Sequence, residues 1–292
     1  MDHSNIPLIS VIVPCFNSGR TIRRTILSVK KQTWVRKEIV LVNDGSTDHL
    51  TINILRELED EKIVKLINQK NNGLASARNK GVNKSSGRFL FFLDSDDWIE
   101  PKALEMMYSH LISNKKCGYI FPDIYLEGKR KGFIEKEFNL FEQFFFNHIP
   151  YCIFISKENF INHGIYDEKM KLGYEDWDLN IKLGKNKIFG KRLPVPIFHY
   201  DVQDKGMLLS KSIKNHIKIW KSIRIKNSSI YKINYLLSEW TLWRRKPSSY
   251  PLILYFIWYL TINVMPEKIS LKLFLSLRNF KILLRRIKFK KN

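Results

Sequence analysis

Short apolar runs alternate with longer amphipathic stretches along residues 1–204. The apolar runs predict strands at 8–17 (where the strand ends in a turn), 39–42, 62–67 and 89–93. The amphipathic stretches predict helices at 21–31, 51–59 and 102–111, and a further helix that follows a polar loop at 71–81. Strands that alternate with helices in this way favour an α/β fold, in which a mixed, mostly parallel sheet is flanked by helices.

The run Phe89–Leu93 has no polar alternation, which is typical of a central strand covered on both faces of a parallel sheet. Asp94, Asp96 and Asp97 follow it at once, and three crowded carboxylates repel one another unless protons or a cation neutralise them. A hard divalent cation, Mg²⁺ or Mn²⁺, would relieve this repulsion. The alternative is a solvated acidic turn in front of the next helix.

Polar residues also end or follow the other predicted strands, namely Asn17, Asp44 and Arg78. Because the carboxyl ends of the strands in a doubly wound sheet line one crevice, we expect these side chains to share a ligand site with the acidic cluster. The glycine-rich loops that bind dinucleotides or ATP, G-x-G-x-x-G and G-x-x-x-x-G-K-[ST], do not occur in the sequence. A diphosphate would therefore need a cation at Asp96 and an arginine such as Arg78.

The positive charge lies almost entirely in the last part of the chain. The 292 residues have a formal net charge of +22, and 44% of them are hydrophobic, which is enough for a full core. Residues 205–292 hold 20 Lys or Arg against 2 Asp or Glu, whereas residues 1–204 hold 30 against 26. We therefore predict a globular domain over 1–204 and a cationic module over 205–292 that faces an anionic partner.

Cysteine content and the N-terminal residues bear on the compartment. Cys15, Cys117 and Cys152 are odd in number and have no metal-ligand spacing, which favours a reducing compartment. No basic segment followed by a long apolar one begins the sequence, so we expect no secretory signal. The sequence predicts a cytoplasmic protein.

Five motifs together resemble the nucleotide-sugar-dependent glycosyltransferases of family 2. They are VIVPCFN, VNDGSTD, NNGLASARNKG, FLDSDDW and GYEDWDL, in this order over residues 8–200. The resemblance implies the GT-A fold, which has a Rossmann-like sheet, and places Asp94 and Ser95 at the nucleotide-sugar. It also implies that Asp96 of the D-x-D motif binds the metal. The other nucleotide-sugar-binding residues would be Pro14 and Asn17 at the base, Asp44 at the base or ribose, and Arg78 at the nucleotide or its phosphates.

A second acidic cluster contains Glu175 and Asp176. Inverting transfer of a sugar needs a base that takes the proton of the acceptor hydroxyl, a role worth typically about 10²–10⁴-fold in rate. The resemblance assigns this base to Asp176 and gives Glu175 a role in orienting the acceptor. Without the resemblance, these residues and Asp178 are better explained as the acidic first turn of a helix, where they complement the helix dipole.

The resemblance also makes His199 a metal ligand, although a lone histidine at the end of a strand can equally be a hydrogen-bonded core residue. Residues 128–151, where acceptor-binding loops are expected, match no pattern that identifies the acceptor. The Q-x-x-R-W motif and the membrane spans of processive synthases do not occur in the sequence. Transfer of a single sugar is therefore favoured over polymerisation.

The cationic module contains two apolar patterns. The stretch 252–264 is about thirteen residues long, short of the ~20 that a spanning helix needs. Further apolar residues recur at steps of three and four, namely Ile269, Leu273, Leu277, Phe280, Leu284 and Ile287. Because basic residues lie largely off this stripe, the pattern predicts an amphipathic helix at an anionic membrane surface. The alternative is a helix packed on the first domain with its basic face in solvent.

The sequence thus predicts an inverting glycosyltransferase, dependent on Mn²⁺ or Mg²⁺, that moves one sugar from a UDP-sugar to a lipid-linked or membrane-proximal glycan in surface polysaccharide biosynthesis. We expect it at the cytoplasmic face of the plasma membrane, without a nucleic acid partner, and its oligomeric state stays open. One alternative is a sugar nucleotidyltransferase, which would need a basic glycine-rich loop near its N-terminus. The other is a nucleotide sensor with a nucleic-acid-binding tail, which would leave Asp176 without a role.

Overall fold

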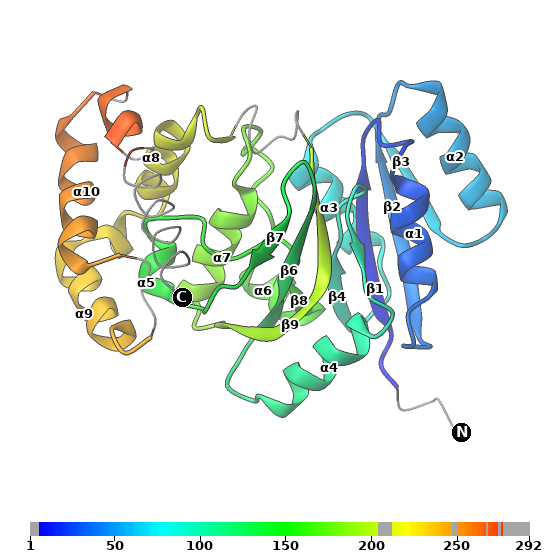
Figure 1. Cartoon of the computed structure of the whole chain (residues 1–292), viewed down its shortest axis with the longest axis horizontal. Coiled ribbons are helices and arrows are strands. Elements are labelled where there is room, and N and C mark those ends of the chain that lie inside the picture. The colour runs from blue at the N-terminus through cyan, green and yellow to red at the C-terminus, as the bar shows by residue number, and fades with distance from the viewer. Residues whose placement is uncertain (1–5, 204–211, 247–249, 267, 274–275, 277–292) are drawn as a thin grey trace. The chain divides into compact units, whose positions relative to one another are not determined.

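The computed structural model describes residues 6–203, 212–246, 250–266, 268–273 and 276 (Figure 1). The chain divides into two compact units, Met1–Gly206 and Met207–Asn292. The assignment of a catalytic domain and a membrane-associating region to the two parts of the sequence stays a prediction.

The first unit is built on a mixed sheet that has nine strands within the described residues, in the order β3-β2-β1-β4-β8-β6-β9-β5, with β7 paired to β6. The strands are β1 (Ile9–Cys15), β2 (Lys37–Asp44), β3 (Lys65–Gln69), β4 (Phe89–Phe92), β5 (Trp98–Ile99), β6 (Tyr119–Gly128), β7 (Gly132–Ile134), β8 (Phe154–Ser156) and β9 (Gly190–Val202). Strands β1 to β4 are parallel. Strand β8 is antiparallel to β4 and β6, whereas β6 and β9 are parallel.

Helices cover both faces of this sheet (Figure 1). They are α1 (Ile22–Lys30), α2 (His49–Asp60), α3 (Leu74–Lys84), α4 (Ala103–Ser113), α5 (Leu140–Gln143), α6 (Lys157–His163) and α7 (Glu175–Lys185). Helix α3 packs against β1 and β2. At Gly81 of this helix, a Cβ atom would lie 2.5 Å from Cγ2 of Ile12, so only glycine allows α3 to approach the sheet this closely.

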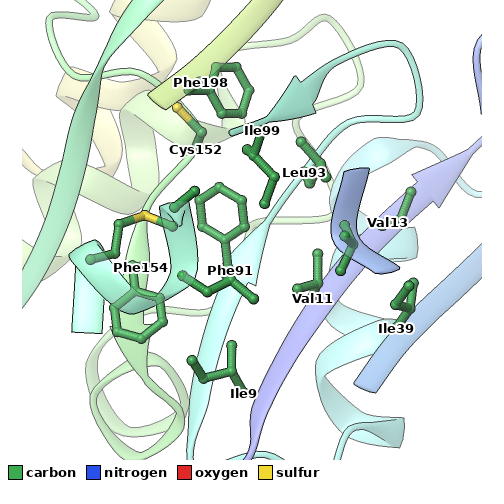
Figure 2. Packing of buried hydrophobic residues seen from close by; sticks show 14 of the residues in the cluster. Ile9, Val11, Val13, Ile39, Phe91, Leu93, Ile99, Cys152, Phe154 and Phe198 are labelled. Carbon is green, nitrogen blue, oxygen red and sulfur yellow. The ribbon is translucent and has the colours of Figure 1, made fainter. Parts of the chain in front are cut away.

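The main core lies on the opposite face of β1 from Ile12. Alternate residues of β1, among them Val11 and Val13, pack with side chains of α1, α4 and β4. Figure 2 shows Phe91 of β4 at the centre of this cluster, between Val11 and Phe154. Since both faces of the central strands are covered, the absence of polar alternation in Phe89–Leu93 follows from the architecture.

The predicted order of strands and helices in the first half of the chain is confirmed, and so is the α/β fold with a mostly parallel sheet. Two boundaries differ from the prediction by three residues or more. Strand β3 begins at Lys65, three residues later than residue 62. Helix α3 begins at Leu74, inside the stretch predicted to be a polar loop, because Gly73, with a φ of +92°, ends that loop.

The second unit contains α8 (His216–Lys226), a 3₁₀ turn at Ser228–Tyr231, α9 (Ile233–Trp243) and α10 (Leu252–Val264). Buried Trp220 and Trp258 meet edge to face with ring centroids 6.1 Å apart, and the Arg224 guanidinium lies 4.9 Å from the Tyr259 ring centroid. No helix within the described ranges is long and apolar enough to cross a membrane. The predicted amphipathic helix over 269–287 lies mostly outside the described residues.

Candidate active site

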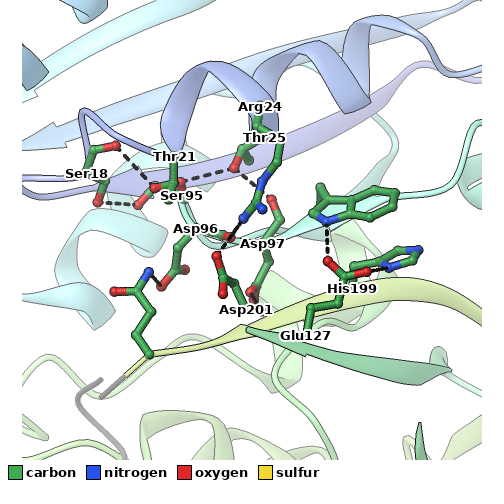
Figure 3. Close-up of polar contacts among 12 residues, drawn as sticks. Ser18, Thr21, Arg24, Thr25, Ser95, Asp96, Asp97, Glu127, His199 and Asp201 are labelled. Carbon is green, nitrogen blue, oxygen red and sulfur yellow. Dashed lines mark hydrogen bonds and ion pairs between the residues drawn. The ribbon is translucent and has the colours of Figure 1, made fainter. Parts of the chain in front are cut away.

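The acidic loop that follows β4 is held by the first turn of α1 and the residues before it. The Thr21 hydroxyl donates to the Ser95 carbonyl oxygen at 2.8 Å, and the Thr25 hydroxyl donates to the carbonyl oxygens of Ser95 at 3.1 Å and Asp97 at 2.7 Å. The buried Ser95 hydroxyl donates to Oγ of Ser18 at 2.8 Å (Figure 3). These bonds fix the backbone of the loop, so its carboxylates have defined positions.

Asp97 is the buried member of the acidic cluster. The Tyr151 hydroxyl donates to Oδ2 of Asp97 and accepts from the Asp94 backbone N–H at 3.0 Å. The Asp201 backbone N–H donates to Oδ1 of Asp97 at 2.9 Å. Burial first, and then the carboxylates of Asp96 and Asp94, raise the pKa of Asp97 well above its ordinary value. With both oxygens bonded and 1% of its surface exposed, Asp97 joins the loop to β9 and does not face a ligand.

Asp96 is half-buried, and nearby groups offset the negative charge of its carboxylate only in part. Burial first, and then Asp94 and Asp201, raise the pKa of Asp96 to about 7, although nearby Arg24 lowers it. Arg24 donates to the Asp96 carbonyl oxygen at 2.6 Å and pairs with the Asp201 carboxylate at 2.9 Å. The side chain that reaches the Asp96 carboxylate is Gln203, whose Nε2 lies 3.2 Å from Oδ2.

Asp96 supplies hard carboxylate oxygens of the kind that Mg²⁺ and Mn²⁺ prefer, and the neighbouring carboxylates that raise its pKa would be neutralised by a divalent cation, so this residue fits one. Gln203 contacts Asp96 as a donor, through Nε2. No cluster of three or more His, Cys, Asp or Glu in the described part of the chain is arranged to hold a metal on its own. A cation at Asp96 would therefore take further oxygen ligands from a bound molecule or from water.

His199 lies in β9 and is held by aromatic rings and carboxylates. Its ring stacks between Trp98, at a centroid distance of 3.4 Å, and Tyr125, at 4.9 Å. Its Nδ1 lies 2.7 Å from a Glu127 carboxylate oxygen, and its Nε2 lies 2.9 Å from one of Glu100. Figure 3 shows His199 beside Glu127 and apart from Asp96. The contacts match the hydrogen-bonded core alternative, and a role of His199 as a metal ligand stays a prediction.

Arg78 connects the two acidic clusters. One terminal nitrogen lies 2.7 Å from Oδ1 of Asp94 and the other lies 2.7 Å from Oε1 of Glu175. The guanidinium also lies over the rings of Tyr151 and Tyr166, at 4.9 and 5.2 Å from their centroids. Only 1% of the Arg78 side chain is exposed, so these partners hold it firmly in place. Its contact with the nucleotide or its phosphates stays a prediction.

Glu175 and Asp176 begin α7, directly after Tyr174, which has a left-handed φ of +61°. The alternative of an acidic first turn is therefore confirmed as local structure. Burial raises the pKa of Glu175 to about 7 in spite of the neighbouring Arg78, and burial also raises the pKa of Asp176. Asp176 accepts from the Trp177 backbone N–H at Oδ1 and from Asn147 Nδ2 at Oδ2, each at 2.9 Å.

The residues predicted to bind the base and ribose organise the loops after β1 and β2. Asn17, with a φ of +51°, accepts at Oδ1 from the backbone N–H groups of Thr47, at 2.8 Å, and of Asp48. Asp44 accepts from a side-chain amide and two backbone N–H groups, those of Gln69, Asn72 and Gly73. Pro14 is buried within β1. Contact of these residues with a nucleotide stays a prediction.

The structure thus brings Ser95, Asp96, Asp94, Arg78 and Glu175 into one connected network, which continues along the chain to Asp176. Sequence reasoning missed four side chains of this network, namely Arg24, Asn147, Tyr151 and Gln203. Asn147 and Tyr151 come from the segment 128–151, which matched no motif. No sequence signal pointed to them, because they reach the site through the tertiary fold and not from a strand end.

The family model described as "Glycosyl transferase family 2" matches residues 10–178, and the chain belongs to this family. A similar curated protein is the UDP-Glc:alpha-D-GlcNAc-diphosphoundecaprenol beta-1,3-glucosyltransferase WfgD of Escherichia coli, 43% identical over 108 residues, which are 37% of this chain and 42% of WfgD. Another is the glycosyltransferase GlyA of Streptococcus pneumoniae, 43% identical over 36% of this chain and 15% of GlyA. The match covers less than half of the length of each relative.

Two solved structures share the fold. S. aureus TarS 1–349 in complex with UDP-GlcNAc has a TM-score of 0.64 at 19% identity, covering 86% of this chain and 78% of that chain. GalNAc-T7 with UDP, GalNAc and Mn²⁺ has a TM-score of 0.59 at 20% identity, covering 75% of this chain and 48% of that chain. The predicted GT-A fold is confirmed by this likeness, and the ligands belong to those two proteins.

Proposed function

We propose that the chain is an inverting, metal-dependent glycosyltransferase that moves one sugar from a UDP-sugar to a lipid-linked or membrane-proximal glycan in surface polysaccharide biosynthesis. One observation is the main support for this function. The acidic loop after β4 and the acidic turn of α7 form a single network through Arg78, in a chain that belongs to family 2. The family favours glycosyl transfer over the nucleotidyltransferase and nucleic-acid-binding alternatives.

The donor part of the proposal rests on the carboxyl ends of β1, β2 and β4. Asp94, Ser95 and Asp96 would lie at the nucleotide-sugar, with Pro14, Asn17, Asp44 and Arg78 behind or beside it. Asp96 would hold a Mn²⁺ or Mg²⁺ ion, with His199 as the other predicted ligand, and the ion when bound would neutralise the diphosphate that leaves. Arg78 keeps Asp94 and Glu175 in place for this purpose. UDP in TarS and GalNAc-T7 supports a uridine nucleotide here.

The acceptor part rests on α7. Asp176 is half-buried, so its carboxylate can meet a hydroxyl group while it remains fixed by two hydrogen bonds. We propose that Asp176 takes the proton of the acceptor hydroxyl as the oxygen attacks the anomeric carbon from the face opposite to the leaving diphosphate. Glu175 would orient the acceptor. The name of WfgD, which specifies a diphosphoundecaprenol acceptor, supports a lipid-linked glycan.

UDP release from a panel of UDP-sugars, with mass spectrometry of the products, tests this function. We expect release from one donor, increased by an acceptor glycan on a lipid diphosphate. Release of diphosphate from a sugar phosphate and UTP would instead favour the nucleotidyltransferase. No UDP release from any donor would contradict the proposal.

Calorimetry of UDP binding tests the metal part separately. Because Asp96 would bind UDP only through the cation, Asp96→Ala should weaken UDP binding in Mn²⁺ and change it little in EDTA. The matched control is Asp60→Ala at the exposed end of α2, which should bind UDP like the parent in both conditions. Equal UDP affinity of the parent protein with and without Mn²⁺ would contradict a metal at Asp96.

We further propose that residues 205–292 hold the enzyme at the anionic cytoplasmic face of the plasma membrane. The charge of this region and a row of exposed apolar residues on α10 support the idea, namely Ile253, Ile257, Leu260 and Val264. Each Lys or Arg near anionic lipid contributes about 1 kcal/mol. Confinement at the surface would raise the effective concentration of a membrane-bound acceptor.

Sedimentation with vesicles tests the membrane proposal. The protein should sediment with anionic vesicles at ~0.1 M salt and less at ~1 M, where the Debye length is about 3 Å. The double variant Ile253→Ser and Leu260→Ser should reduce the vesicle binding that persists at high salt. The control is Leu50→Ser, at an exposed position of α2, which should not reduce it. Full-length protein that stays in solution with anionic vesicles at low salt would contradict it.

A further inference from the structure

Asn147 lies in the segment between α5 and β8 and contacts the carboxylate proposed to act as the base. Its Nδ2 donates to Oδ2 of Asp176 at 2.9 Å, while the Trp177 backbone N–H donates to Oδ1 at 2.9 Å. We infer that Asn147 is a positioning residue, which holds the Asp176 carboxylate in the orientation that takes the acceptor proton. The inference rests on the proposed function, since it gives Asn147 a role only if Asp176 is the base.

The segment that contains Asn147 is fastened to α7 next to the contact. The Trp177 indole N–H donates to the Gln143 carbonyl oxygen. Helix α5 packs on α7 so closely that a Cβ atom at Gly184 would lie 2.2 Å from Leu140 Cδ1. Beyond Asn147, the Tyr151 hydroxyl bonds the acidic loop after β4. The Asn147 amide is therefore held between two anchored points, one on each acidic cluster.

A carboxylate that is fixed at one oxygen can still turn about its Cβ–Cγ bond and present either lone pair to a substrate. The backbone bond at Oδ1 alone leaves this freedom to Asp176, and the Asn147 amide at Oδ2 removes it. A neutral amide does so without adding a charge to a site that already contains the carboxylates of Glu175 and Asp94. Misplacing a reacting group by about 1 Å can cost roughly 10²-fold in rate.

The same hydrogen bond favours the ionised form of Asp176. Burial raises the pKa of this carboxyl, and the Asn147 amide lowers it, as does the positive charge of Arg78. The carboxylates of Asp94 and Glu175 oppose ionisation of Asp176. The phenols of Tyr166 and Tyr200 also face Asp176 and stay neutral, because burial raises their pKa. Loss of the amide should therefore move the pKa of Asp176 upward, so that a higher pH is needed to form the base.

The pH dependence of kcat/KM for UDP release, from the UDP-sugar that the donor panel identifies, tests the inference. We expect Asn147→Ala to lower kcat by about 10²-fold, to leave the donor KM unchanged and to move the acid limb of the profile to higher pH. Asn147→Ser, which keeps a hydroxyl donor, should recover part of the rate. Asn139→Ala is the control, because it removes the N-cap of α5, the helix just before this segment, and leaves the bond to Asp176 intact.

The outcomes separate this inference from the proposed function. If Asp176→Asn has lost activity but Asn147→Ala keeps the parental kcat and the parental acid limb of the pH profile, the positioning role is overturned. If Asp176→Asn is as active as the parent, the base assignment itself is wrong and Asn147 has nothing to position. If Asn147→Ala fails to fold, the acid limb of the pH profile is measured for Asn147→Ser instead. A loss of rate with an unshifted limb, shared by Asn139→Ala, would show a purely structural role and would also overturn the inference.

Discussion

The acidic loop after β4 and the acidic first turn of α7 contain similar residues but are stabilised in different ways. The loop is held by the hydroxyl groups of Thr21 and Thr25 and by Tyr151, and its buried member, Asp97, accepts two hydrogen bonds from neutral donors. Arg78 pairs with Asp94 at the start of this loop. The turn is stabilised by two positive charges, Arg78 at Glu175 and Lys182 at Asp178, and by the Asn147 amide at Asp176. Two clusters of like charge thus become compatible with a folded protein by different means.

The difference indicates different tasks. Asp96 lies near the carboxylates of Asp94 and Asp201, and burial and these two charges raise its pKa to about 7, so its surroundings favour a neutralising proton or cation. Asp176 has a hydrogen-bond donor at each oxygen and a guanidinium nearby, which suits a carboxylate that gains and loses a proton in place. The first cluster is suited to binding and the second to proton transfer, and the following predictions test this contrast.

The largest effect should come from Asp176→Asn. Because the amide cannot accept the acceptor proton, the rate of sugar transfer should fall by about 10²–10⁴-fold, while the affinity for UDP in Mn²⁺ stays near that of the parent. Steady-state kinetics and calorimetry on the same preparation measure both quantities. Parental transfer by this variant would remove the functional contrast between the clusters.

Arg78→Met should cause the largest loss of stability. It leaves the buried carboxylate of Glu175 and the half-buried one of Asp94 without their cation, so the free energy of unfolding should fall by about 3–5 kcal/mol in a denaturant titration at pH 8. At pH 6 the loss should be smaller, because Glu175 can then take up a proton. Arg23→Met, which breaks the exposed pair of Arg23 with Glu57, should cost no more than about 1 kcal/mol. Equal losses for both variants would contradict a structural link through Arg78.

Tyr151→Phe tests the other cluster. The variant removes the hydroxyl that bonds the Asp97 carboxylate and the Asp94 backbone N–H, which should cost about 1–3 kcal/mol of unfolding free energy. Tyr108→Phe, whose ring packs against Trp34, is the matched control and should change stability less. If the two variants unfold at the same denaturant concentration, the hydroxyl does not organise the acidic loop.

The smallest effect should be a change in how steeply the free energy of unfolding depends on pH. The folded-state pKa of Glu175, about 7, is above its ordinary value of 4.5, so the native protein binds more protons than the unfolded chain between these values. Stability contributed by this group is therefore present at low pH and is lost as the pH rises toward 7. Glu175→Gln should reduce this loss by at most about 1.4 kcal/mol per pH unit, as measured by unfolding titrations at several pH values. An unchanged slope would contradict the raised pKa.

The sequence predicted most of the fold of the first unit because local patterns specify its elements. Each central strand is an apolar run, and each of the early helices has an apolar face. Boundaries were less certain, as with β3 and α3, because a loop that ends at a positive-φ glycine looks like any other polar stretch. The antiparallel part of the sheet was not predicted, since β5, β7 and β8 contain two or three residues each.

The sequence by itself determined the order of strands and helices, the acidic clusters at Asp94–Asp97 and Glu175–Asp176, and the concentration of positive charge after residue 204. Only the tertiary structure decided which side chains meet. It turned Arg78 toward two carboxylates, placed His199 between two aromatic rings and put Gln203 beside Asp96. It also brought Asn147 to Asp176. The physical reason is that periodicity and propensity act over a few residues, whereas these contacts join residues far apart in the chain and depend on how the sheet and its helices pack.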